Sequence, residues 1–284
     1  MIAKGKDRAW AALSALGCGA AAVLLADVVL FGAPAPPELG AAAVWLADRD
    51  GDRVVVLDRE LFVLSSIAVR APIAVAPVDG GAWVLSVPAR HARGSRRLEF
   101  IAADGARTEV SELDASFGTL AALGAECAVV GADDGRVRWI TASTRRVVRE
   151  LRVAGSIHDL APAARDGSVW ILATAATTEL ACVDAAGERV AGPFDVGAAH
   201  SVAASLAGGV RTYEPARTRQ LDERGRVVST VALVHSPAVV EAAAGARGGE
   251  WFVATAGGVV ALDAHGRIAA GQGGFDYLVD IAVR

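Results

Sequence analysis

The side chains best suited to chemistry are histidines and carboxylates that recur in the second half of the chain. His158 and His200 lie 42 residues apart, and each is followed by a polar residue, Asp159 or Ser201. Neutral imidazole binds divalent metal ions, and its pKa near neutrality suits a general base. Further candidates for the same site are His235, Tyr277 and Asp280. These residues form a ligand or metal site, with His158 and His200 as the metal ligands, or they are semi-exposed polar residues along a hydrated channel.

A second candidate site is a group of basic residues in one predicted loop. Within eight positions the chain contains Arg90, His91, Arg93, Arg96 and Arg97. Such a patch attracts polyanions, carboxylate ligands or acidic partners. The alternative is a solvated loop that keeps the edge of a strand soluble.

A repeat of about forty residues indicates which elements position these side chains. Six copies lie between Ala41 and Arg284, and each contains a hydrophobic strand, a loop, a second strand and a short turn. A period of about forty with several short strands predicts one blade of a β-propeller per copy. One column of the repeat, expected to pack between blades, contains Trp45, Trp83, Ala128, Trp170, Val210 and Trp251. A second column, at strand ends, contains Asp58, Ala102, Thr141, Asp184, Asp222 and Asp263.

The order of the strands predicts an all-β, six-bladed propeller that is closed by its C-terminal strand. We name the strands of a blade A to D from the centre outward. The last strand A, Val279 to Val283, has no strand B after it, and the first strand B, at Val44, has no strand A before it. Pairing these two strands closes the ring and removes its open edges. The A strands are expected to begin near Ile73, Gly118, His158, His200, Ala238 and Val279.

The alternation of strand directions predicts the two faces of the ring. One face carries the starts of the A strands and the B–C loops, and therefore the histidines and the arginine loop. The other face, which we call the turn face, carries the A–B and C–D turns. Propellers usually bind ligands where the A strands converge on the mouth of the channel.

Several acidic residues are predicted to be structural. Asp184, Asp222 and Asp263 are each followed by Gly three positions later, which is the preference of a type I turn. The sequence Asp48-x-Asp50-x-Asp52 begins like a calcium loop, but Arg53 stands where the required Gly would be. A β-hairpin turn is therefore predicted here instead.

Two segments resemble known propeller repeats. Leu46 to Asp58 resembles the NHL-type repeat, in which two strands flank an Asp-containing turn. Gly167 to Ile171 resembles the Gly-x-x-Trp-Val strand of virginiamycin B lyase-like propellers. The resemblance implies a six-bladed propeller. Because the lyase-like propellers use histidines and a carboxylate near the channel, it also implies a metal-assisted lyase or hydrolase, with His158, His200 and His235, as an alternative function.

The N-terminal residues 1–31 are expected to export the protein. Three basic residues precede an apolar stretch from Ala9 to Phe31, predicted as a helix, that is interrupted only by Asp27. Its uncharged part is long enough for a marginal membrane span. The positive charges before it place the remainder outside the cytoplasm. Residues 1–31 form an uncleaved signal anchor, a lipoprotein signal ending at Cys18 or a cleaved signal peptide, and a Pro-rich linker, 32–40, leads to the propeller, 41–284.

Composition and motifs narrow the possible functions. The net charge is −4 and the pI is near 5.8, which gives no global attraction to nucleic acid. The sequence contains no haem-attachment motif, no phosphate-binding loop and no Gly-x-Ser-x-Gly elbow. Cys127 and Cys182 fall in strands of different blades and indicate no disulfide framework, so they are expected to be buried apolar thiols.

These observations favour a non-catalytic, membrane-tethered, extracytoplasmic propeller that binds a partner protein or small ligand through its histidine face. No cofactor is expected, and a divalent metal bound by His158 and His200 is the alternative. The alternative is the metal-assisted lyase or hydrolase. Stoichiometric metal that is lost when His158 and His200 are both replaced by Ala would favour the enzyme.

Overall fold

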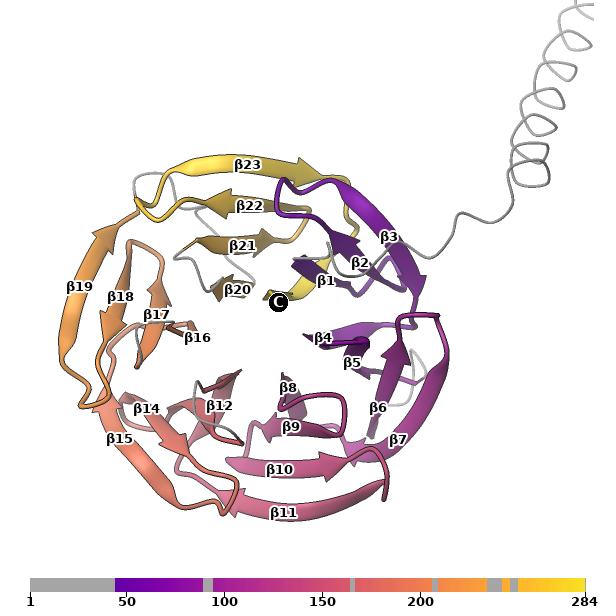
Figure 1. Cartoon of the computed structure of the whole chain (residues 1–284), viewed down its shortest axis with the longest axis horizontal. Helices are drawn as coiled ribbons and strands as arrows, with labels where there is room; N and C mark the ends of the chain where they lie inside the picture. The colour runs from indigo at the N-terminus through magenta and orange to yellow at the C-terminus, as the bar shows by residue number, and fades with distance from the viewer. Residues whose placement is uncertain are drawn as a thin grey trace, which may run out of the picture. The chain divides into compact units, whose positions relative to one another are not determined.

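The chain folds into a ring of six β-sheets, as predicted. The computed structural model describes residues 44–88, 94–163, 167–205, 209–233, 242–245 and 250–283, and in these ranges all regular structure is β-strand. Six four-stranded antiparallel sheets are arranged in a circle with one strand of each at the centre (Figure 1). The apolar N-terminal segment and the linker lie outside the described residues.

Each blade contains four strands, which follow one another from the centre of the ring outward. Blade 1 contains β24 (Leu278–Val283), β1 (Val44–Asp48), β2 (Arg53–Leu57) and β3 (Val63–Ala68). Blade 2 contains β4 (Pro72–Val78), β5 (Gly81–Ser86), β6 (Ser95–Ala102) and β7 (Arg107–Asp114). Blade 3 contains β8 (Phe117–Ala122), β9 (Cys127–Ala132), β10 (Arg136–Thr141) and β11 (Arg146–Arg152).

The second half of the ring continues the same order. Blade 4 contains β12 (Ser156–Pro162), β13 (Val169–Thr174), β14 (Thr178–Val183) and β15 (Arg189–Asp195). Blade 5 contains β16 (Ser201–Ala204), β17 (Val210–Glu214), β18 (Arg217–Leu221) and β19 (Val227–Ala232). Blade 6 contains β20 (Ala242–Gly245), β21 (Trp251–Thr255), β22 (Gly258–Leu262) and β23 (Ile268–Gly273). Five of the six predicted A-strand starts are confirmed to within two residues; Ala238 lies outside the described residues.

The C-terminal strand closes the ring. β24 pairs antiparallel with β1, so that Val283 lies opposite Val44 and Ile281 opposite Leu46. The fully buried carboxylate of Asp48 holds the same junction, because it accepts hydrogen bonds from Arg53 Nε at 2.8 Å and from the Tyr277 amide at 2.9 Å. The predicted closure is therefore confirmed, and Asp48 belongs to a hairpin between β1 and β2, as expected.

The C–D turns are built by the predicted Asp and Gly pairs. In blade 5, the Gly225 amide donates to the Asp222 carbonyl at 2.9 Å, and Asp222 Oδ1 accepts the Arg226 amide at 2.9 Å. Gly225 has a φ of 76°, a region that side chains other than Gly rarely adopt. Asp184 and Asp263 make the equivalent bonds in blades 4 and 6. These carboxylates are structural, as predicted.

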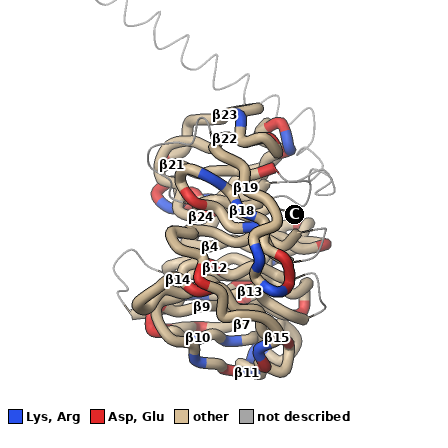
Figure 2. The backbone as a smooth tube through the Cα atoms, turned by 90° about the vertical axis from the view of Figure 1, so that its left-hand side faces the viewer, with Lys and Arg blue, Asp and Glu red and all other residues tan. Residues whose placement is uncertain are grey.

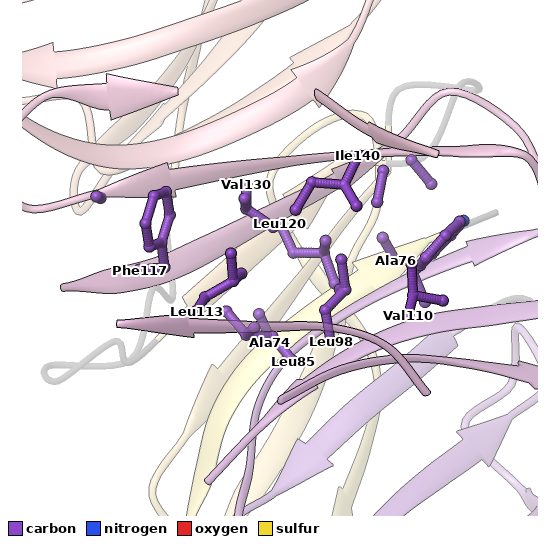
Figure 3. Packing of buried hydrophobic residues seen from close by; sticks show 14 residues of the cluster. Ala74, Ala76, Leu85, Leu98, Val110, Leu113, Phe117, Leu120, Val130 and Ile140 are labelled. Carbon is purple, nitrogen blue, oxygen red and sulfur yellow. The ribbon is translucent and has the colours of Figure 1, made fainter. Parts of the chain in front are cut away.

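The hydrophobic core is divided into six clusters, each lying between two neighbouring blades. Between blades 2 and 3, Leu85 and Leu98 of one sheet pack against Leu120, Val130 and Ile140 of the next (Figure 3). Because every blade depends on two neighbours, the ring is stabilised as one cooperative unit.

The predicted Trp column is buried throughout, but three of its six members point the other way. Trp45, Trp83 and Trp170 pack against the following blade, whereas Ala128, Val210 and Trp251 pack against the preceding one. Adjacent residues of a strand point to opposite sides, so a shift of one residue reverses the face. The residues that face the following blade at these three places are Val129, Arg211 and Phe252. Arg211 is the unusual member, because its guanidinium lies 5.4 Å from the centre of the Trp251 ring.

Candidate functional site: the central channel

The innermost strands surround a cavity of about 600 Å³ on the axis of the ring. Alanine is the most frequent residue in its wall, and all six A strands contribute. Small side chains leave the centre open, whereas larger ones would fill it. Every A strand contributes at least one of these alanines, for example Ala282, Ala76, Ala121, Ala161, Ala203 and Ala243. The wall also includes Asp79, Gly124, Gly167, Ser205 and Gly245, which lie at or beyond the ends of A strands, so the cavity extends from the middle of the channel toward the turn face.

Two carboxylates stand at equivalent positions on opposite sides of this cavity. Asp280 pairs with the residue two positions after Trp45, and Asp159 pairs with the residue two positions after Trp170. Their blades, 1 and 4, lie three apart in a ring of six. Asp159 and Asp280 therefore face each other across the channel.

Each of the two carboxylates joins its blade to the next. Asp159 Oδ2 accepts the amide of Val202 on β16 at 2.8 Å, and Asp280 Oδ2 accepts the amide of Val75 on β4 at 2.8 Å. An innermost strand presents unpaired backbone groups toward the channel, and a carboxylate from the neighbouring blade satisfies one of them. The strand order placed both residues near the channel but did not predict these inter-blade bonds.

The position of the two carboxyl groups favours their protonated forms. Burial, together with the charge of Asp280, raises the pKa of Asp159 to about 8 despite the opposing effect of the hydrogen bonds from the Val202 and Leu160 amides. Burial likewise raises the pKa of Asp280 to about 7. Near neutral pH the pair therefore holds exchangeable protons, and it can offer a ligand both hydrogen-bond donors and acceptors.

We expect the two aspartates to make the ring less stable as the pH rises. Their folded pKa values lie above the unfolded value of about 3.9, so between about pH 4 and pH 8 the folded state binds more protons than the unfolded state. Stability is then highest at the acidic end of that window and falls toward its alkaline end. The double variant Asp159→Asn and Asp280→Asn keeps one oxygen at each position that can accept the inter-blade amide of Val202 or Val75, and it cannot ionise. Its melting temperature should exceed that of the wild type at about pH 8.

Thermal melts over this pH window measure the effect. The exposed change Glu223→Gln is the matched control and should leave the slope unchanged. A double Asn variant that keeps the wild-type slope would show that the pair does not carry the pH dependence.

The predicted histidine site is placed only in part. His158 belongs to β12, at an irregularity in its pairing with β13, and its side chain is exposed. His200 directly precedes β16, its side chain is exposed, and its amide donates to the Tyr213 carbonyl at 2.8 Å. Neither residue lines the cavity. His235 lies outside the described residues, and among those that are described no group of three or more His, Cys, Asp or Glu is arranged to hold a metal ion.

Of the other predicted site residues, Tyr277, Arg96 and Arg97 are described, and none of the three is part of the cavity wall. The Tyr277 amide donates to Asp48, where it contributes to ring closure. Arg97 forms an ion pair of 3.4 Å with Glu109 on the neighbouring outer strand. Partial burial and the nearby charge of Arg49 lower the pKa of Arg96, whereas Asp133 raises it. Arg90 and Arg93 lie outside the described residues, so the extent of the basic patch stays a prediction.

The fold identifies the chain as a six-bladed β-propeller. A solved structure of a protein of unknown function from Bacteroides caccae is similar, with a TM-score of 0.60 and 11% sequence identity, over 86% of this chain and 98% of that one. At this identity the likeness concerns the fold alone. No protein-family model and no curated protein matches the sequence.

Proposed function

We propose that this chain is a membrane-tethered, extracytoplasmic propeller that binds a small ligand on the axis of the ring. The observation that supports binding is the cavity of about 600 Å³ with Asp159 and Asp280 on opposite walls. The inner strands surround this space, and the carboxyl pair supplies polar anchors in its wall. The acidic lining suits a ligand that carries hydrogen-bond donors or a positive charge.

The tether is supported by the sequence rather than by the described residues. The apolar stretch from Ala9 to Phe31 follows basic residues and precedes the propeller. Within the described part of the chain, no helix is long and apolar enough to cross a membrane. The kinship with NHL-type and virginiamycin B lyase-like propellers is likewise a proposal, based on the hairpin from Leu46 to Asp58 and on Gly167 to Ile171.

A channel-blocking variant tests ligand binding. Ala204 lines the cavity, is only partly buried and belongs to none of the six core clusters, so Ala204→Phe should fill the space without disturbing the core. We expect one or more members of a panel of primary, quaternary and polyamines to raise the melting temperature of the wild type but not of Ala204→Phe. Neutral sugars serve as the comparison set. Equal shifts in both proteins would place binding elsewhere, and no shift with any amine would count against a cation-binding channel.

Membrane fractionation tests the tether separately. The full chain should stay in the membrane pellet after alkaline carbonate extraction, because carbonate releases proteins that are bound only at the surface. After the same extraction, a variant that begins at residue 41 should appear in the soluble fraction, because carbonate also releases a ring that is bound only at the surface. Release of the full chain by carbonate would contradict an uncleaved anchor.

A further inference from the structure

Exposed large hydrophobic side chains occur at the same position in every blade that has them, at the start of the outer strand. In the described part of the chain there are eight of them, and each lies within the first three residues of an outer strand or directly before it. The outer strands form the perimeter of the ring (Figure 1). We call this set of seven aliphatic residues and one phenylalanine the aliphatic rim; it comprises Phe62, Val63, Val147, Val148, Val190, Val227, Val228 and Ile268, whose exposed fractions range from 40% to 69%.

An irregularity in strand pairing accounts for the outward position of the rim. In blades 1, 3, 4, 5 and 6 the outer strand has one extra residue near its start, opposite the end of strand C. A β-bulge of this kind changes the direction of the neighbouring side chains. In blade 2 the irregularity lies elsewhere, and its outer strand begins with Arg107 and Thr108 instead of large aliphatic residues.

The rim lies on the same face of the ring as Val44, the first residue of β1. Outer strands begin directly after the C–D turns, and these turns share a face with the start of β1, where Val44 lies opposite Val283. Residues 32–43 connect Val44 to the predicted membrane segment. Twelve residues span at most about 40 Å when fully extended, so a tethered ring stays close to the bilayer.

The rim also carries basic residues suited to a lipid surface. In four blades an exposed arginine directly precedes the first aliphatic residue of the rim: Arg146, Arg189, Arg226 and Arg267. Arg226 forms an ion pair with Asp222 at 2.7 Å. Acidic and basic residues are interspersed over the ring (Figure 2), so the aliphatic side chains, rather than a net positive charge, distinguish this edge. Arginine beside aliphatic residues is typical of segments that lie in the membrane interface.

We propose that the aliphatic rim docks the ring, turn face first, onto the surface of a lipid bilayer. This inference rests on the tether in the proposed function, because the linker brings the turn face to the membrane. Aliphatic side chains enter the interface, and the arginine heads contact lipid phosphates. The face that carries the A-strand starts then points toward the solvent.

Flotation of the ring, residues 41–284, with lipid vesicles tests the inference without the tether. The ring closes on itself through β24 and β1, so it is a self-contained folding unit. We expect it to float with vesicles of phosphatidylcholine and phosphatidylglycerol. The triple variant Val148→Thr, Val190→Thr and Val228→Thr replaces one methyl group by hydroxyl at each site and should lower the vesicle partition coefficient about tenfold.

Two further variants make the test more specific: one should increase vesicle binding, and the other is a matched control. Thr108→Val adds an aliphatic residue to blade 2 and should increase binding, whereas Thr230→Val, on the exposed middle of β19, should not. Unchanged melting temperatures show that the variants are folded. A ring that never floats, or a triple variant that floats like the wild type, would overturn the proposal. Self-association of the ring that the triple variant abolishes, without flotation, would assign the rim to a second copy instead. If the full chain stays in the membrane pellet after carbonate extraction but the ring does not float with vesicles, the docking proposal is refuted and the tether is not.

Discussion

Removal of the C-terminal strand is expected to abolish the cooperative unfolding of the ring. Truncation after Gly274 deletes β24 and exposes the edge of β1, which pairs with it over its whole length. Leu278 and Ile281 leave the core cluster between blades 6 and 1, and the hydrogen bond that the Val75 amide donates to Asp280 is lost. Since each blade depends on two neighbours, damage at one junction should spread around the ring.

Circular dichroism and calorimetry of residues 41–274 measure this effect. We expect no sharp melting transition near that of residues 41–284. A synthetic peptide of residues 275–284 should restore part of the transition if the rest of the ring is competent to pair with it. A truncated protein that melts like the complete ring would contradict closure by β24.

The second large effect is expected from the core between blades 2 and 3. The Trp83 side chain is fully buried. Its ring packs edge-on against Phe100, with 5.4 Å between the ring centroids, and its Nε1 donates to the Gly124 carbonyl at 3.0 Å. Trp83→Ala should lower the free energy of unfolding by about 3 to 5 kcal/mol, because it leaves a cavity in the core.

Denaturant unfolding measures that loss, with Phe62→Ala as the control. Phe62 is also aromatic but is 69% exposed, so its removal should change stability by less than about 0.5 kcal/mol in the absence of lipid. A loss below about 1 kcal/mol for Trp83→Ala would mean that this cluster does not hold the blades together.

The sequence was sufficient to predict the blades and the closure, because both follow from local patterns. Asp222 and Gly225 mark a turn, β-branched runs mark strands, and the unpartnered strand at Val279 requires a partner at Val44. It was harder to predict which neighbouring blade an individual side chain packs against. Trp251 matched the column by residue type, yet the neighbouring Phe252 occupies the equivalent position, because an error of one residue reverses the side of a strand.

The candidate site was predicted only in outline for a similar reason. Asp159 and Asp280 were placed near the channel from the strand order, but their equivalence depends on pairing registers that no single strand reveals. The cavity itself arises from six short alanine-rich strands whose convergence is a property of the closed ring. His158 and His200 were candidates because of their residue type, whereas the residues that line the cavity are their neighbours in the sequence.

The central proposal is that the carboxyl pair in the channel holds a ligand. Proton exchange during ligand binding tests this proposal most directly. Isothermal titration calorimetry of the tightest-binding amine from the panel, in buffers with different ionisation enthalpies near pH 7, counts the protons released. A cation between Asp159 and Asp280 favours their ionised forms, so we predict net proton release and much weaker binding in the Asp159→Asn and Asp280→Asn double variant. Binding of equal affinity to that variant, with no proton release by the wild type, would contradict a ligand site at the channel carboxylates.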